Sequence, residues 1–291
     1  MCAGAQLYAD ARSIIQAAAT VGLSVRVPTA LQDASWAQEI WGFGRWDRVS
    51  KSKTFETSPA IIATPDGPVL QELEFSLTPA WAREYPLRAS TYNARLNRPK
   101  VKRGTQAIQT DDSDQPVFER VYEYPAYRSA WSQGRFCLVP LSAGIESSYA
   151  GEYDQQRFAF SLPDGALMFL LGLWDEWINR QSGETHRGFT LFTSFPQTAM
   201  RRFGHHREVV MVDHTLWPQL LDGNPKTAAA YTHIIQNRID PPYQATPYAP
   251  LKTRKGAPGA EDFLYPEEDQ ALMDAAGRNW LQTRLNALAT P

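Results

Sequence analysis

Cysteine is scarce in this chain of 291 residues, which contains only Cys2 and Cys137. A secreted protein held together by disulfides normally needs more than one possible pair, so this number fits a reducing compartment. The sequence also has no Cys-x-x-Cys pair and no cysteine and histidine cluster with the spacing of a zinc site. We therefore expect no metal centre.

The chain also lacks a long apolar run and an excess of charge of either sign. A membrane span would need about 20 consecutive apolar residues, and none is predicted. Asp10 and Arg12 interrupt the apolar residues of the amino end, which argues against a signal peptide. We predict a cytoplasmic protein without membrane contact. Because the formal net charge is −2, any binding to nucleic acid must use a local basic face.

The residues that are present predict an α+β fold. The chain is 43% hydrophobic, which is enough to bury one large core. Two Pro-Asp-Gly turns, starting at Pro65 and Pro163, separate apolar runs, because proline presets φ and glycine accepts a positive φ. Strands are predicted over 59–64, 68–77, 135–141, 157–162, 166–174, 188–195 and 208–212. Helices are predicted over 8–19, 33–41, 196–203, 213–221, 225–235 and 267–288.

These elements predict one main domain with two appended stretches. Because strands and helices do not alternate regularly, we expect a strand-rich, barrel-like central sheet surrounded by helices, within residues 1–255. Residues 97–118 carry basic and then acidic side chains with few large apolar ones, which predicts an exposed insertion. Residues 236–262 are rich in Pro and Ala and are expected to wrap the surface. Residues 256–291 are expected to form a C-terminal helical extension.

The second residue can carry unusual chemistry. Removal of Met1 would give Cys2 a free α-amine beside its thiol. An α-amine has a pKa of about 7.8, against about 10.4 for lysine, so much more of it is nucleophilic at neutral pH. The amine adds to an aldehyde as an imine, and the sulfur then closes a five-membered thiazolidine ring. Taken alone, Cys2 is most often a chance residue, so the hypothesis depends on the residues downstream.

Five short motifs follow one another in an order that resembles a known family. They are Met1-Cys2, Asn93-Ala94-Arg95, the stretch from Trp131 to Glu146, Leu171-Gly172-Leu173-Trp174, and Phe192-Thr193-Ser194 followed by His205-His206-Arg207. Together they resemble the SOS-response-associated peptidase (SRAP) family, proteins that cross-link to abasic sites in single-stranded DNA. The order and the approximate spacing hold from Cys2 to about Val212, and more weakly to about Lys255.

The chain departs from the family pattern at several positions. The arginine that follows Cys-Gly in the family is missing, and Ile145 and Ser147 replace the aromatic residues that usually flank the glutamate. Glu56 stands where the family has an asparagine. The element after His206-Arg207 also continues differently. These departures predict that the contacts with DNA are more altered than the chemistry.

The resemblance implies a catalytic group made of Cys2, Asn93, Glu146 and His205. Glu146 would have a raised pKa and protonate the hydroxyl that leaves during ring closure, although without the resemblance it is better explained as a surface glutamate in a loop. His205 would hold the sugar oxygens or act as a second acid-base group, and the alternative is a structural histidine. The motif register favours His205 over His206. Asn93 would orient the amine or a sugar hydroxyl.

The resemblance also implies a DNA-binding group. Arg95, Arg98 and Arg207 would contact phosphates, and Trp81 would wedge against or stack on bases. The alternatives are a solvated basic loop past Arg98 and a core tryptophan at position 81. Cys137 lies inside an apolar run and is expected to be a core residue, without a role as a second nucleophile.

The sequence therefore leads to one main hypothesis and two alternatives. The main hypothesis is a monomeric shield of abasic sites in single-stranded DNA, which forms a thiazolidine through Cys2 without metal or organic cofactor. Met1 would leave by self-processing, through an N-to-S acyl shift at Cys2, or through a host aminopeptidase. The alternatives are a non-catalytic module that binds single-stranded DNA, and an amidohydrolase with an N-terminal cysteine nucleophile.

Overall fold

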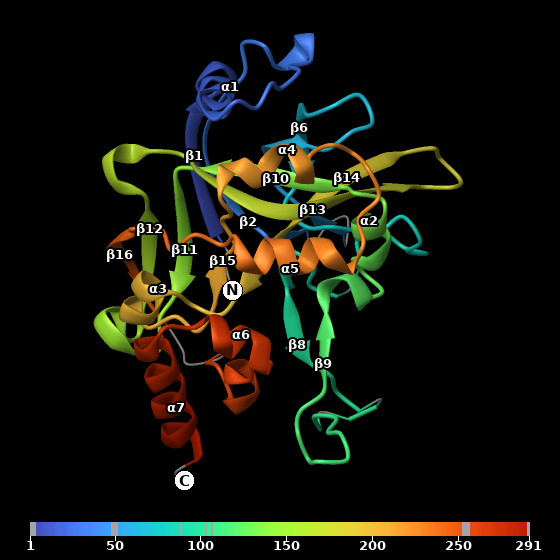
Figure 1. Cartoon of the computed structure of the whole chain (residues 1–291). Coiled ribbons are helices and arrows are strands. Elements are labelled where there is room, and N and C mark those ends of the chain that lie inside the picture. Colours follow the sequence, from blue (N-terminus) through green and yellow to red (C-terminus); the bar gives the residue numbers. More distant parts are fainter. Residues whose placement is uncertain are drawn as a thin grey trace.

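A barrel-like ring of five strands forms the centre of the protein, in a computed structural model that describes residues 4–47, 52–87, 89–102, 104–105, 107–251 and 257–289. The ring consists of β5 (Thr57–Ile62), β6 (Val69–Glu74), β10 (Phe136–Leu141), β13 (Met168–Ile178) and β14 (Thr185–Ser194). The strands follow the order β13-β10-β5-β6-β14, and a further pairing between β13 and β14 closes the ring (Figure 1). Two short strands, β7 (Asn93–Arg95) and β15 (Glu208–Val209), add to β14.

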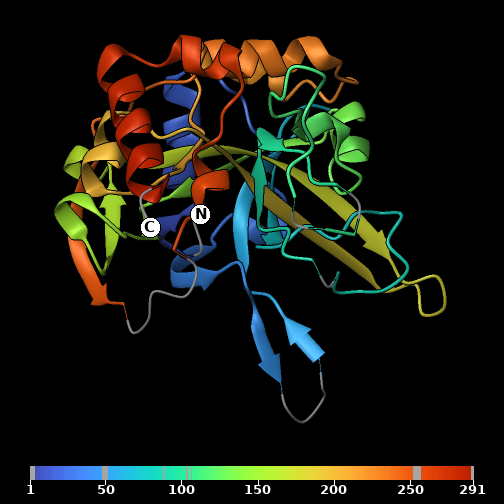
Figure 2. The ribbon, with the colours of Figure 1, turned by 90° about the horizontal axis from the view of Figure 1, so that it is seen from below.

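A second sheet of five strands packs against the ring. Its order is β16-β12-β11-β1-β2. The strands are β1 (Gly4–Asp10), β2 (Ser35–Trp41), β11 (Ala143–Ser147), β12 (Gln156–Ser161) and β16 (Gln244–Pro250). Two hairpins complete the strands, β3 (Arg45–Asp47) with β4 (Ser52–Thr54) and β8 (Asn97–Pro99) with β9 (Phe118–Arg120). Figure 2 shows the β3–β4 hairpin projecting from the body of the molecule.

The apolar run of β10 shows why the sequence forms this ring. All six of its residues are buried, because the two faces of the strand pack into two different clusters. Leu138 points into the cluster under the helices, whereas Cys137 and Val139 point into the cluster between the ring and the second sheet. In a strand that is buried on both faces, apolar residues do not alternate with polar ones. Cys137 is free and fully buried, and burial raises the pKa of its thiol, so its prediction as a core residue is confirmed.

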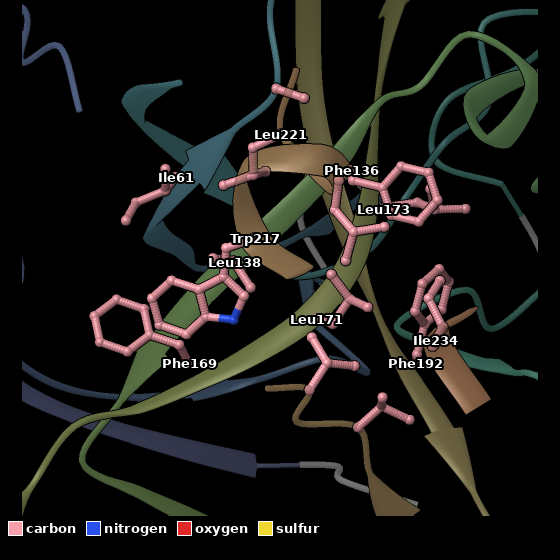
Figure 3. Packing of buried hydrophobic residues seen from close by; sticks show 14 of the residues in the cluster. Ile61, Phe136, Leu138, Phe169, Leu171, Leu173, Phe192, Trp217, Leu221 and Ile234 are labelled. Atoms are coloured by element: carbon pink, nitrogen blue, oxygen red, sulfur yellow. The ribbon is translucent and has the colours of Figure 1, made fainter. Parts of the chain in front are cut away.

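Short helices cover the outer face of the ring. They are α1 (Ala11–Thr20), α2 (Arg128–Ser132), α4 (Trp217–Leu220) and α5 (Ala228–Gln236). Figure 3 shows Trp217 packed beside Leu138 and Phe169, and the rings of Trp217 and Phe169 have their centres 5.1 Å apart. The remaining helices are α3 (Thr198–Phe203), α6 (Glu267–Leu272) and α7 (Ala275–Ala289). Within the described ranges, no helix combines the length and the apolar character needed to cross a membrane.

The predicted α+β class with a barrel-like centre is confirmed, but two predicted helices near the amino end are wrong in whole or in part. The helix predicted over 8–19 starts at Ala11, after Asp10, whose side chain accepts a hydrogen bond from the Ser13 amide. The segment 33–41 forms β2 and pairs with β1 along seven residues. Its buried Trp36 and Ile40 are four residues apart, a spacing that fits one face of a strand as well as one face of a helix.

Other boundaries also differ from the prediction. The helix predicted over 225–235 begins at Ala228, capped by the Thr227 hydroxyl. The single helix predicted over 267–288 is two helices, α6 and α7. The stretch 236–262 contains the edge strand β16. The described residues among 100–115 lie mainly at the surface, as the predicted insertion requires, whereas Asn97 is buried.

Replacing Gly172 tests the closure of the ring. A Cβ atom at Gly172 would lie 2.0 Å from the carbonyl oxygen of Thr190 on the neighbouring strand. We expect Gly172→Ala to lower the free energy of unfolding by about 3 kcal/mol or more, because backbone on β14 must move. Gly67→Ala is the control, since its site is open but its φ is +92°, which costs about 1 kcal/mol. Urea denaturation measures both, and equal losses would contradict the account.

Candidate functional site

The second sheet places Glu146 inside the protein. Glu146 lies on β11, opposite Phe158 of β12, and only 4% of it is exposed. The preceding Gly144 allows this close packing, because a Cβ atom there would lie 2.2 Å from the ring of Phe160. Glu146 is therefore a buried strand residue, and the alternative of a surface glutamate in a loop is wrong.

His205 lies beside Glu146 because α3 ends at Phe203 and Gly204, its C-cap, turns the chain. Gly204 has a φ of +82°, and a Cβ atom there would lie 1.7 Å from the carbonyl oxygen of Ala150. His205 is 1% exposed. Its Nδ1 lies 2.7 Å from the carbonyl oxygen of Ser147, and its Nε2 lies 3.4 Å from a carboxyl oxygen of Glu146. A carbonyl oxygen only accepts, so Nδ1 carries the hydrogen and the neutral ring turns the lone pair of Nε2 toward Glu146.

Burial sets the protonation of this acid–histidine pair, Glu146 and His205. Burial raises the pKa of Glu146 to about 7 and lowers the pKa of His205 well below 6.5. Both shifts favour the uncharged pair, in which the carboxylic acid donates its proton toward Nε2. A carboxyl group that holds a proton near neutral pH is suited to general acid catalysis.

His206 occupies a different environment from its neighbour. Its ring packs near that of Phe263, with centres 5.9 Å apart, and its carbonyl oxygen accepts a hydrogen bond from the Tyr265 hydroxyl. Burial lowers the pKa of His206 as well. Of the two histidines, His205 is the one within reach of the Glu146 carboxyl group.

The start of β1 leads toward the acid–histidine pair. β1 and β11 are antiparallel, with Gln6 opposite Ala143 and Gly4 opposite Ile145. Following β1 back toward the amino end therefore moves along β11 toward Glu146. Cys2 lies outside the described residues. Because it precedes Gly4 by two residues, covalent geometry limits the distance between their Cα atoms to about 7 Å.

Two arginines, Arg95 and Arg207, lie near the end of β14, Arg95 on β7 and Arg207 directly before β15. β7 pairs with β14 so that Arg95 lies opposite Thr193, and β15, which follows Arg207, pairs with the same stretch. Arg95 forms an ion pair with Asp262. Arg207 is 1% exposed, and burial lowers its pKa to about 10. Its Nη2 donates to the carbonyl oxygen of Asp262 at 3.5 Å, whereas Nε and Nη1 make no hydrogen bond with any described residue.

A groove of about 760 Å³ runs beside Arg95, and we refer to it as the basic groove. Arg98 stacks on the ring of Tyr124, with its guanidinium carbon 3.8 Å from the ring centre, and Tyr127 donates to the carbonyl oxygen of Asn93. The groove is lined by Ser90, Asn93, Arg95, Arg98, Pro99, Val101, Ile108, Tyr124, Tyr127, Ala260, Glu261 and Leu264. It joins three of the predicted site residues, Asn93, Arg95 and Arg98.

The structure separates two of the predicted DNA-binding residues from the groove surface. Trp81 is 50% exposed, does not line the groove, and donates from its indole nitrogen to the carbonyl oxygen of Pro125. Arg207 is buried beneath the C-terminal residues Asp262 and Tyr265. As the chain is folded here, a phosphate cannot reach Arg207 without movement of that covering segment.

Two tyrosines of the groove, Tyr124 and Tyr127, were not among the predicted site residues. Tyr124 and Tyr127 belong to a stretch, Tyr-Glu-Tyr-Pro-Ala-Tyr, that follows Arg120 and precedes Arg128. Aromatic residues between arginines are a signal for nucleic-acid binding that could have been used. No pattern in the sequence marked Asp262 as the partner of Arg95, because 167 residues separate them.

The fold and site define a protein class, an α+β protein with a barrel-like centre, a buried acid–histidine pair and an adjoining basic groove. The sequence model of the SOS response associated peptidase (SRAP) family matches residues 117–250. The resemblance predicted from the motifs is thereby confirmed over these residues. Comparison with the sequences of curated proteins gave no match.

Solved structures support the fold. A protein from Bacteroides thetaiotaomicron is 18% identical, with a TM-score of 0.57 over 84% of this chain and 91% of its own. A protein from Bordetella bronchiseptica is 16% identical, with a TM-score of 0.56 over 85% of this chain and 99% of its own. A phage-related protein from Bordetella bronchiseptica is 15% identical, with a TM-score of 0.50 over 85% and 94%. At these identities the likeness concerns the fold alone.

The raised pKa of Glu146 predicts how stability depends on pH. In the unfolded chain the carboxyl group loses its proton near 4.5, and in the folded protein near 7. Between these values the folded state binds more protons, so the contribution of Glu146 to stability falls as pH rises and is constant above about 7. The free energy of unfolding of Glu146→Gln minus that of the wild type should therefore be about 2–3 kcal/mol higher at pH 8 than at pH 5. Urea denaturation at the two pH values measures this, and a difference independent of pH would contradict the buried acid.

Proposed function

We propose that this protein shields abasic sites in single-stranded DNA by forming a thiazolidine between Cys2 and the ring-opened sugar aldehyde. The observation that carries the proposal is the register of β1, whose first described residue, Gly4, lies opposite Ile145, next to the buried Glu146. The SRAP match supports a role associated with the SOS response, since that is how the family is described. The proposal requires that Met1 is removed first.

The acid–histidine pair supplies the proton that ring closure needs. The α-amine of Cys2 adds to the aldehyde carbon and leaves a hydroxyl group on it. Glu146 protonates that hydroxyl, which departs as water, and the Cys2 sulfur adds to the resulting iminium carbon. The thiol proton returns to Glu146, so the net change is aldehyde plus aminothiol giving thiazolidine plus water. Nε2 of His205, at 3.4 Å, holds the carboxylic acid in place and keeps its proton near the reacting carbon.

The basic groove would hold the strand on either side of the lesion. Arg95 and Arg98 line it, paired with Asp262 and Glu119, and their guanidinium groups would exchange these carboxylates for phosphates. Tyr124 and Tyr127, 3% and 5% exposed, support Arg98 and the groove wall from beneath, so the ring available for stacking on a base is that of the exposed Trp81. A local basic face of this kind is compatible with a net charge of −2.

The Cys2 thiol can also remove Met1. The Cys2 thiol attacks the carbonyl carbon of Met1 and shifts the acyl group from nitrogen to sulfur, and water then releases Met1 from the thioester. The word peptidase in the family description supports this self-processing. An aminopeptidase of the host would leave the same free Cys2 amine.

The first test is a gel assay with an oligonucleotide that contains one abasic site. We expect the wild-type protein to form an adduct that survives heating in denaturing buffer, and Cys2→Ala to form none. Cys137→Ala is the matched control, because Cys137 is fully buried and its replacement should leave the adduct intact.

Other outcomes of this assay would favour the alternatives. Salt-sensitive binding of single-stranded DNA without an adduct would indicate a non-catalytic binding module. The absence of both binding and adduct would turn attention to an amidohydrolase that uses Cys2. An adduct that persists in Cys2→Ala would show that another residue, such as a lysine, reacts with the aldehyde.

The pH dependence of the adduct rate tests Glu146. The rate should rise as the Cys2 amine loses its proton near its ordinary pKa of about 7.8 and fall as Glu146 loses its own proton near 7. The wild type should therefore show a bell-shaped profile with its maximum between these values. Glu146→Gln should react about 10²- to 10⁴-fold more slowly and lack the falling limb. Single-turnover kinetics measure both effects, and an unchanged rate in the variant would exclude Glu146 as the acid.

A further inference from the structure

The C-terminal segment, residues 257–289, lies against the cations of the site. It consists of a single helical turn (Ala260–Phe263), α6 and α7. Figure 1 shows α6 beside β8, and α7 below α3. The segment carries six acidic residues and two arginines. This acidic segment thus presents carboxylates to basic side chains of the body.

Four of the six acids of this segment contact a polar or basic side chain of the body. Asp262 pairs with Arg95, and Glu268 pairs with Arg120 at the base of the β8–β9 hairpin. The other two pairs are Asp274 with Arg201, at 3.0 Å, and Asp269 with Asn97. Carboxylates at these positions present anionic oxygens to arginine forks, as backbone phosphates do.

The C-terminal segment covers Arg207 without satisfying all of its hydrogen-bond donors. The side chain is fully buried, yet its single hydrogen bond among the described residues is to the main-chain carbonyl of Asp262. Two of its nitrogens, Nε and Nη1, have no hydrogen-bond partner there. Buried guanidinium nitrogens without hydrogen-bond partners are unfavourable, and an anion that reached them would gain charge-assisted hydrogen bonds.

The apolar attachment of the segment to the body is small. The buried residues of its apolar cluster are Phe263, Tyr265, Met273 and Leu281 from the segment itself, with Phe195 from the body. Among the described residues, every backbone–backbone hydrogen bond of the segment is internal. The two large clusters beneath the helices and between the sheets contain no residue of the segment. Its displacement would therefore leave both main cores intact.

The segment also forms one wall of the basic groove, through Ala260, Glu261 and Leu264. It starts beyond residue 250, where the SRAP match ends. The cover is thus added to the part of the chain that carries the family pattern.

From these contacts we infer that the C-terminal segment is an autoinhibitory cover, which competes with single-stranded DNA for Arg95, Arg120 and Arg207. The inference rests on the proposed function. When phosphates replace the carboxylates, one set of ion pairs is exchanged for another. The single-stranded DNA therefore displaces the cover at a low net cost in free energy. Displacement also opens Arg207 to a phosphate.

Binding of an unmodified single-stranded oligonucleotide tests the cover. We expect Asp262→Asn combined with Glu268→Gln to lower Kd by about tenfold relative to the wild type, because two competing carboxylates are lost. The control is Asp33→Asn combined with Asp66→Asn, two exposed acids outside the segment. This control makes the same change in net charge and should alter Kd by less than about twofold. Fluorescence anisotropy in one buffer measures all three proteins.

Hydrogen exchange on the unaltered wild type provides a second measurement. Saturating oligonucleotide should speed hydrogen exchange of the α6 amides, because α6 loses its contacts with the body. Unchanged or slower exchange would contradict the proposed cover. The cover would also be overturned if both double variants gained the same affinity for the oligonucleotide. The same holds if Asp262→Asn/Glu268→Gln bound no more tightly than a wild type that binds. Either result would leave the proposed function standing. If none of the three proteins binds the oligonucleotide, both the cover and the proposed function fail.

Discussion

The burial of one carboxyl group beside one histidine is the constraint on which the site depends. Glu146 is held inside the second sheet, and the ring nitrogen of His205 is fixed by the carbonyl of Ser147. Low exposure keeps a proton on the pair near neutral pH, which an exposed glutamate would lose. β11, the strand that carries Glu146, also pairs with β1, so the fold that shifts the pKa also directs the start of β1, at Gly4, toward the acid.

The sequence predicted the central ring well because its strands carry strong signals. β5 and β6 flank one Pro-Asp-Gly turn, β13 follows the other, and β10 is a continuous apolar run. The second sheet was largely missed for physical reasons. β16 contains two prolines, which only an edge strand tolerates, and β11 is short and contains Gly144. Glu146 was predicted through the family resemblance, whereas its position on a strand required the pairing of β11 with β1 and β12.

The departures from the family pattern have structural consequences that the sequence could not reveal. Glu56, which replaces an asparagine, accepts a hydrogen bond from the Trp41 amide and forms an ion pair with Arg45. Arg95 and Arg207 were predicted from the motifs, but their contacts with Asp262 depend on a segment more than 50 residues further along the chain. Local patterns predict which side chains can act, and only the folded chain shows which of them are covered.

The most direct test of the central claim is mass spectrometry of the adduct after nuclease and protease digestion. The account predicts an amino-terminal peptide that begins at Cys2, lacks Met1 and carries the sugar remnant on both the α-amine and the thiol. An unmodified amino-terminal peptide that retains Met1, or a remnant attached elsewhere in the chain, would contradict it.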